Sequence, residues 1–213
     1  TINSAPRFTH ERVETGNLLL NSERFISSDW DKGTGGVTVE PNYALSPDNK
    51  FSATRLNLAA SSSTWIKQDI NLVNGKTYTF SVYVKDAGNS SHFELYIYKA
   101  SVITQRLGKT AAPSEWSRYS VTFTATADGA YQCGIDNGND SYTTDVLIWG
   151  AQLDEGTEAT TYVPSIDTFT SRATTGGGGT YVDSAGLVKT AAVDVARYSH
   201  DPETLTPTGL YLE

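Results

Sequence analysis

The pattern of a pleated strand is plainest in the stretch Lys76-Thr77-Tyr78-Thr79-Phe80-Ser81-Val82-Tyr83-Val84. Its larger apolar side chains alternate with mostly polar ones, and a period of two is typical of a strand that buries one face. Asn74-Gly75, directly before this stretch, is a strong turn signal. Residues 65–70, on the other side of that turn, also predict a strand, so the chain here is expected to run strand, turn, strand.

Similar alternation recurs along most of the chain, at residues 92–98, 119–124, 130–136 and 145–153. Turn-forming residues lie between these segments, at 86–91, 112–113, 128–129 and 136–140. Nearer the start, Leu18-Leu19-Leu20 predicts a buried strand, Trp30 a core aromatic, and residues 37–39 and 53–56 further strands. Short strands at this spacing predict an all-β sandwich.

Composition excludes several classes of function. The chain has 213 residues and a net charge of −8, which argues against a nucleic-acid partner, because binding phosphates needs clustered Lys and Arg. No apolar run approaches the roughly 20 residues of a membrane helix, and no signal peptide opens the chain. The single cysteine, Cys133, excludes an internal disulfide and is expected to be a buried free thiol. The chain opens at Thr1 and lacks methionine, so we expect a segment or processed form of a longer modular protein.

The two ends of the chain differ from the middle in their sequence patterns. Glycines at 176–179 predict a flexible join, and residues 183–186 predict a turn that pairs 181–182 with 187–188. A short motif at residues 7–11 is repeated, conservatively, at 197–201. We therefore predict an N-terminal connector at 1–16, a sandwich at 17–164, and a Gly-rich join with a β-hairpin connector at 165–213.

Several motifs together resemble a known family. Residues 17–23 with Trp30, residues 75–85, and residues 149–156 with 162–164 resemble the carbohydrate-binding-module-like jelly rolls of bacteriophage tail and fibre proteins. Residues 181–202 resemble the connector that accompanies such jelly rolls. The resemblance implies a jelly-roll fold and an extracellular virion protein on a tail or head fibre. It also implies a homo-oligomer, with a trimer favoured, that touches host glycans or other virion proteins.

The alternation also predicts a binding face on the side of the strands away from the core. A sugar needs an aromatic ring for its C–H face and amides or carboxylates for its hydroxyls. Plain solvated surface and a contact with a neighbouring subunit stay open as alternatives. Trp65 and Trp149 rank below the tyrosines, because large aromatics are more often core. The predicted face consists of Tyr83, Glu94, Tyr96, Tyr98, Gln132 and Asp136.

A structural calcium ion is a second expectation, and it comes from the resemblance. Related jelly rolls often hold one where the first strand meets the last, and here Glu23 and Asp145 occupy positions that could supply oxygen ligands. Residues 136–140 are also rich in oxygen ligands, although the same residue types form tight turns. No cofactor is expected to be required.

Signs of catalysis are weak. Glu94 and Asp136 could share a face as a carboxylate pair, and Asp154-Glu155 follows a strand, but nothing distinguishes them from ordinary surface acids. Nucleophile elbows, phosphate loops and paired-His metal spacing are absent from the sequence. We therefore expect a non-catalytic virion module that binds host-surface polysaccharide. A purely structural module that contacts other subunits is the alternative, and a glycan-degrading spike is an outlier.

Overall fold

The computed structural model describes residues 16–61, 63–89, 91–100, 102–138, 142–165, 180–182, 185, 187–190, 197–200 and 207–211. The chain forms two compact units, Thr1–Ile166 and Asp167–Glu213. Among the described residues, no helix has the length and hydropathy that a membrane span requires.

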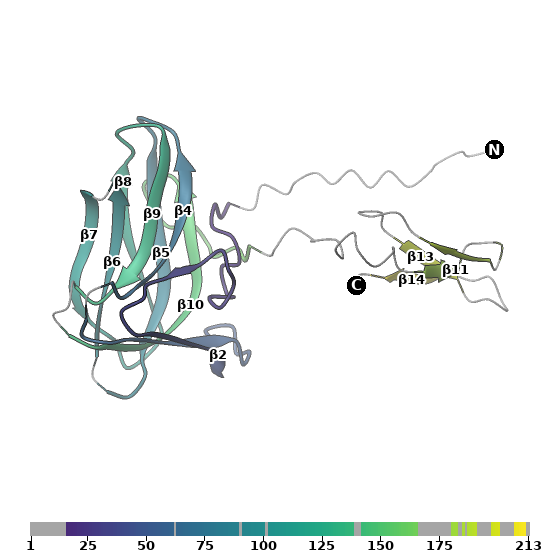
Figure 1. Ribbon diagram of the computed structural model, residues 1–213, viewed down its shortest axis with the longest axis horizontal. Helices are drawn as coiled ribbons and strands as arrows, with labels where there is room; N and C mark the ends of the chain where they lie inside the picture. The colour runs from purple at the N-terminus through teal and green to yellow at the C-terminus, as the bar shows by residue number, and fades with distance from the viewer. Residues whose placement is uncertain are drawn as a thin grey trace. The chain divides into compact units, whose positions relative to one another are not determined.

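The first unit is a sandwich of two antiparallel five-stranded sheets (Figure 1). Sheet A contains, in spatial order, β1 (Asp31–Lys32), β4 (Trp65–Leu72), β9 (Gly129–Asp136), β6 (His92–Lys99) and β7 (Val102–Ala111). Sheet B contains β2 (Val37–Ala44), β3 (Ala53–Leu58), β10 (Thr144–Glu155), β5 (Thr77–Asp86) and β8 (Ser117–Thr124). The predicted all-β jelly-roll sandwich is confirmed.

The core lies between the sheets and follows from the period of two. Phe80 and Val82 of β5 are fully buried, and Leu95 of β6 meets them from sheet A. Trp30 is a core residue as expected. Cys133 is a free cysteine in the same core, and burial raises the pKa of its thiol.

The turn at Asn74-Gly75 exists, but it does not close a hairpin. Gly75 has a φ of +80° and donates its N–H to the carbonyl of Ala125 at 2.8 Å. The strand before it, β4, pairs with β1 and β9 in sheet A, whereas the strand after it, β5, pairs with β10 and β8 in sheet B. The turn therefore carries the chain from one sheet to the other.

Leu18-Leu19-Leu20 is not a buried strand. Leu19 is buried, but Leu18 and Leu20 are 43% and 49% exposed, and no strand includes them. Asn17 explains the difference, because its side-chain oxygen accepts hydrogen bonds from the N–H groups of both Leu19 and Leu153 at 3.1 Å. The segment is thereby tied to β10 as a loop, with a single leucine inserted into the core.

The second unit contains two short antiparallel pairs. Strand β11 (Thr180–Val182) pairs with β12 (Val188–Thr190), and Val182 opposes Val188 as the sequence predicts. Strand β13 (Arg197–His200) pairs with β14 (Pro207–Tyr211). The counterpart of β13 at residues 7–11 lies outside the described residues. The boundaries at 16–17 and 164–165 stay predictions.

Candidate functional site

The outer face of sheet A presents three rows of side chains that cross the strands β4, β9 and β6. Core residues such as Ile66, Leu95 and Cys133 point inward, so their neighbours in sequence point outward. Register then fixes which outward residues meet. The rows are Trp65–Asp136–Glu94, Lys67–Gly134–Tyr96 and Asp69–Gln132–Tyr98.

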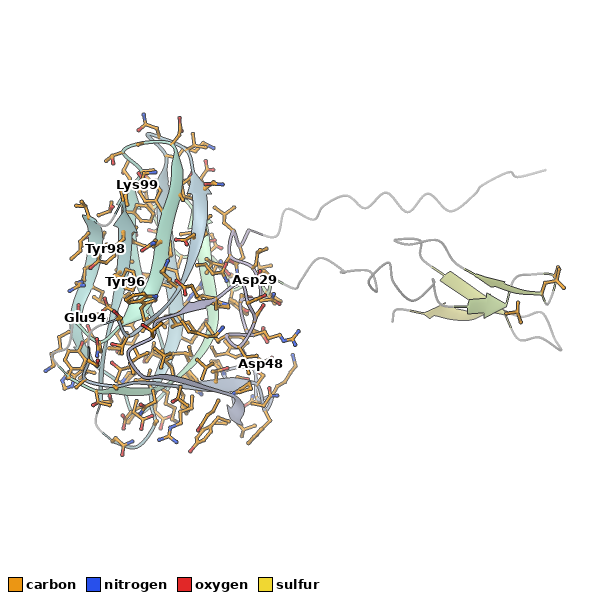
Figure 2. All side chains as sticks on the ribbon, viewed as in Figure 1. Asp29, Asp48, Glu94, Tyr96, Tyr98 and Lys99 are labelled. Atoms are coloured by element: carbon orange, nitrogen blue, oxygen red, sulfur yellow. The ribbon has the colours of Figure 1, made fainter. Side chains whose placement is uncertain are left out.

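A pocket of about 340 Å³ opens on this face. Figure 2 labels Glu94, Tyr96 and Tyr98, which follow one another along β6. Of the predicted face, Tyr96, Tyr98, Gln132 and Asp136 line the pocket, and Glu94 lies beside it, directly opposite Asp136. The full lining is Asp31, Ser63, Thr64, Trp65, Lys67, Tyr96, Tyr98, Gln132, Asp136 and Asn137.

The rim of the pocket is held by hydrogen bonds to backbone carbonyls. Thr64 Oγ1 donates to the carbonyl of Ser61 at 2.9 Å, and the carbonyl of Ser63 accepts from the N–H of Gly35 at 3.0 Å. Asn137, which follows β9, is buried and its amide donates to the carbonyl of Ala59 at 2.6 Å. The rim is therefore preorganised, which lowers the conformational entropy that is lost when a ligand binds.

Tyr96 forms the floor of the pocket and is not an exposed stacking platform. Only 3% of it is exposed, although it points away from the core. Its ring lies over Gly134 of β9, where an added Cβ would approach Tyr96 Cζ at 3.0 Å. The ring also meets Tyr98 edge-on, with centroids 4.9 Å apart. The expectation of an exposed Tyr96 that stacks on a sugar is wrong, because the missing side chain at Gly134 lets the Tyr96 ring pack closely against β9.

Tyr83 does not belong to this face. It lies in β5 of sheet B, opposite Arg118 of β8, whose guanidinium carbon lies 5.4 Å from the centroid of the Tyr83 ring. Its ring also packs edge-on against Trp149 of β10 at 5.5 Å. The prediction that Tyr83 joins Tyr96 and Tyr98 is wrong, because the turn at 74–75 places β5 in the other sheet.

One charge cluster lies at the β6–β9–β7 side of the pocket. Arg106 of β7 contacts Glu94 Oε2 through Nη1 at 3.1 Å and Asp136 Oδ2 through Nη2 at 3.3 Å. Burial raises the pKa of Asp136 from 3.8 to about 6, and Glu94 adds to the rise, while the N–H of Gly138 and the Arg106 charge oppose it. The sequence does not reveal Arg106, because residues 102–111 lack the alternation that predicts a strand.

A second charge cluster lies at the β1–β4 side. Lys67 is almost fully buried, and its Nζ contacts Asp31 Oδ2 and Asp69 Oδ2, each at 3.2 Å. Both carboxylates are more than half exposed, at 54% and 51% of their side chains. Like Arg106, Lys67 is therefore shared between two carboxylates, and both pairs face the ligand side of sheet A.

Trp65 and Gln132 offer polar groups that the described protein leaves free. The buried indole N–H of Trp65 has no hydrogen-bond partner among the described residues, and the side chain of Gln132 makes no hydrogen bond to them either. Buried donors without partners are rare and call for an explanation such as a ligand or water. The core positions of Ile66 and Leu72 in the same strand were the available signal that Trp65 points outward.

Glu23 and Asp145 are not brought together. Asp145 accepts two hydrogen bonds from Arg55 at 2.8 Å, which hold the pKa of its carboxyl below the ordinary value. Glu23 instead accepts from the Tyr162 hydroxyl at 3.1 Å. The Tyr162 ring packs on Trp149, four positions beyond Asp145 and about 13 Å along β10. This pair does not fit a calcium ion.

No group of three or more His, Cys, Asp or Glu side chains within the described ranges is arranged to hold a metal ion. Glu94 and Asp136 do share a face, as the sequence suggested, but the guanidinium of Arg106 lies against both carboxylates. What the pocket offers a ligand is an aromatic surface, free amide and indole groups, and paired charges. These are the features of a site that binds a polyhydroxylated molecule.

Comparison with known proteins agrees with this description. The model of a carbohydrate-binding domain family matches residues 27–133, just over half of the chain. Comparison with curated proteins found no match.

Similar solved structures include a CBM4 structure, with 15% identity over 60% of this chain and 95% of that chain and a TM-score of 0.44. The CBM22-1-GH10 modules of a Clostridium thermocellum endo-1,4-β-D-xylanase, complexed with xylohexaose, share 16% identity over 70% of this chain and 29% of that chain, with a TM-score of 0.46. The enzymatically active domain of a bacteriophage CBA120 tailspike shares 12% identity over 65% of this chain and 21% of that chain, with a TM-score of 0.47. On the strength of the family match over residues 27–133, this chain belongs to the carbohydrate-binding domain family.

Proposed function

We propose that the pocket on the outer face of sheet A binds a host-surface polysaccharide, and that the chain is a non-catalytic module of a virion fibre. The observation behind the binding site is the buried indole N–H of Trp65, which has no partner among the described residues, in a pocket that Gln132 also lines and Tyr96 floors. Membership of the carbohydrate-binding domain family supports the class of ligand.

The proposed binding mode uses the two kinds of surface that a sugar needs. The rings of Trp65 and Tyr98, both partly exposed, cover the C–H face of a sugar. Gln132 and the Trp65 N–H then bind its hydroxyls, and the carboxylate of Asp136 accepts further hydrogen bonds. Each copy binds weakly, and several copies on one particle multiply the effect by avidity.

The proposed setting on a virion rests on the resemblance of residues 75–85 and 181–202 to phage jelly rolls and their connectors. In that setting the module is extracellular, forms a homo-oligomer with a trimer favoured, and contacts other virion proteins through its end segments. Neither nucleic acid nor a membrane is a partner in this proposal.

A retention experiment tests the glycan function. Wild-type protein is run through native gels that contain bacterial surface polysaccharides, and is compared with Trp65→Ala, Tyr98→Ala and the control Phe51→Ala. Phe51 is a matched aromatic because it is 62% exposed and precedes β3 in sheet B. We expect at least one polysaccharide to retard the wild type and the control, and both pocket variants to bind about tenfold more weakly, equivalent to about 1.4 kcal/mol.

Retention that is unchanged in both pocket variants would contradict this site. Loss of the oligomer in size-exclusion chromatography of Tyr98→Ala would favour the structural alternative, in which the face contacts another subunit. Release of reducing ends from the retarding polysaccharide would contradict the non-catalytic part of the proposal and favour a glycan-degrading spike.

A further inference from the structure

Carboxylates outnumber cations around the pocket, and this excess of negative charge affects which sugars the pocket can bind. Each of the two cations, Lys67 and Arg106, is held between two carboxylates at 3.1–3.3 Å. Lys67 lies between Asp31 and Asp69, and Arg106 lies between Glu94 and Asp136. With every carboxylate ionised, each cluster has one more negative than positive charge.

Among the described residues, an acidic sugar meets no available cation in this pocket. Lys67 is nearly buried beneath its two partners, and both Nη atoms of Arg106 already contact carboxylates. Like charges placed together across an interface are strongly unfavourable. A uronate in the pocket would therefore face the surplus negative charge without a positive group to pair with.

An amino sugar meets the opposite situation. Asp31 lines the pocket and its side chain is 54% exposed, so one face of its carboxylate is open to a ligand. Asp136 lines the pocket from β9. A protonated amine can donate charge-assisted hydrogen bonds to such oxygens, and these are stronger than bonds between neutral groups.

We propose that this pocket ranks glycans by charge, binding amino sugars more tightly than neutral ones and rejecting uronic acids. The inference rests on the proposed function, because it concerns which glycan the same pocket takes. It differs from a general effect of the chain's net charge of −8, since the screening length at physiological salt is about 8 Å and only nearby charges contribute.

A matched ligand series tests the ranking. The probes are soluble oligosaccharides of gluco, galacto and manno configuration, each prepared as the hexose, the hexosamine and the hexuronate, and titrated calorimetrically at 0.15 M NaCl. In the configuration that binds, we expect the hexosamine to bind about tenfold more tightly than the hexose, and the hexuronate at least about tenfold more weakly. The spread should narrow at 1 M NaCl, where the screening length is about 3 Å.

Two variants separate the pocket from the rest of the surface. Asp31→Asn removes an exposed carboxylate paired with Lys67, and should lower the ratio of hexosamine to hexose affinity severalfold. Asp69→Asn serves as a second variant if the first unfolds. Glu115→Gln is the control, since it also removes an exposed carboxylate paired with a lysine, Lys85, whose strand β5 lies in sheet B, and it should change neither affinity.

The outcomes distinguish this inference from the proposed function. Hexose binding that is lost in Trp65→Ala, together with a hexuronate that binds as tightly as the hexose, would overturn the charge ranking and leave the glycan site intact. A hexosamine preference that Glu115→Gln lowers as much as Asp31→Asn would overturn it as well. If no probe and no polysaccharide binds, the proposed function fails, and the ranking fails with it.

Discussion

Glu94 and Asp136 lie directly opposite each other on the neighbouring strands β6 and β9, and both contact one guanidinium, that of Arg106. Burial disfavours the ionised form of Asp136 and the neighbouring Glu94 carboxylate adds repulsion, while the single cation offsets these effects only in part. The pocket is therefore lined by a carboxylate, Asp136, whose ionised form is disfavoured in the folded protein.

Asp136→Asn should therefore stabilise the protein at neutral pH. The folded-state pKa of about 6 lies above the ordinary 3.8, so the stability that protonated Asp136 contributes is complete below about pH 4 and is lost as pH rises through 6. The variant keeps the uncharged form at every pH. In urea unfolding we expect a gain of up to about 3 kcal/mol at pH 7.5, reduced by the lost contact with Arg106, and no gain near pH 3.5. An equal difference at both pH values would contradict this interpretation.

Gly134→Ala should damage both the fold and the pocket. An added Cβ would approach the Ile66 carbonyl oxygen at 2.5 Å and Tyr96 Cζ at 3.0 Å, so the tyrosine floor has to move. We expect a loss of about 1–3 kcal/mol in unfolding free energy and weaker glycan retention. Gly108→Ala in edge strand β7 is the matched control, because nothing lies within 4 Å of its added Cβ. Equal stability of the two variants would mean that Tyr96 does not lie over β9.

Asp145→Asn should destabilise the sandwich equally with and without calcium. Its carboxylate is bound by Arg55, and hydrogen bonds to charged groups contribute about 1.5–3 kcal/mol each when buried, less here because Arg55 is partly exposed. Thermal unfolding in calcium and in chelator provides the measurement. A larger effect of the substitution in calcium would show that Asp145 is a metal ligand after all, since a ligand bound only to the folded state raises its stability.

The sequence is sufficient to predict the all-β sandwich fold and the outward-facing residues of β6. Alternation in residues 76–84 and 92–98 predicts which side chains enter the core, because a strand with one buried face admits only a period of two. The same alternation does not say which sheet a strand joins. The Asn74-Gly75 signal is the same for a hairpin and for a crossing between sheets, so the sequence does not separate Tyr83 from Tyr96.

The missed residues have separate physical reasons. Strand β7 lies at a sheet edge with little burial, so residues 102–111 lack the alternation that reveals a strand, and Arg106 was overlooked with them. The burial of Tyr96 in β6 depends on Gly134, which lies opposite it in the neighbouring strand β9 and is 38 residues away in the chain. Such a contact follows from register, which the sequence alone does not determine.

The indole N–H signals of the four tryptophans test the central claim most directly. Three of them have hydrogen-bond partners within the protein, at 3.0–3.1 Å: Trp30 with the Asn21 carbonyl, Trp116 with the Leu45 carbonyl and Trp149 with Ser52 Oγ. Only Trp65 has none among the described residues. The protein is titrated with an oligosaccharide derived from a polysaccharide that retards it in the gel, and two-dimensional ¹H–¹⁵N spectra are recorded. We predict that the Trp65 indole signal shifts and that the other three indole signals do not. Movement of Trp116 or Trp149 with Trp65 unchanged would place the ligand on sheet B and contradict the account.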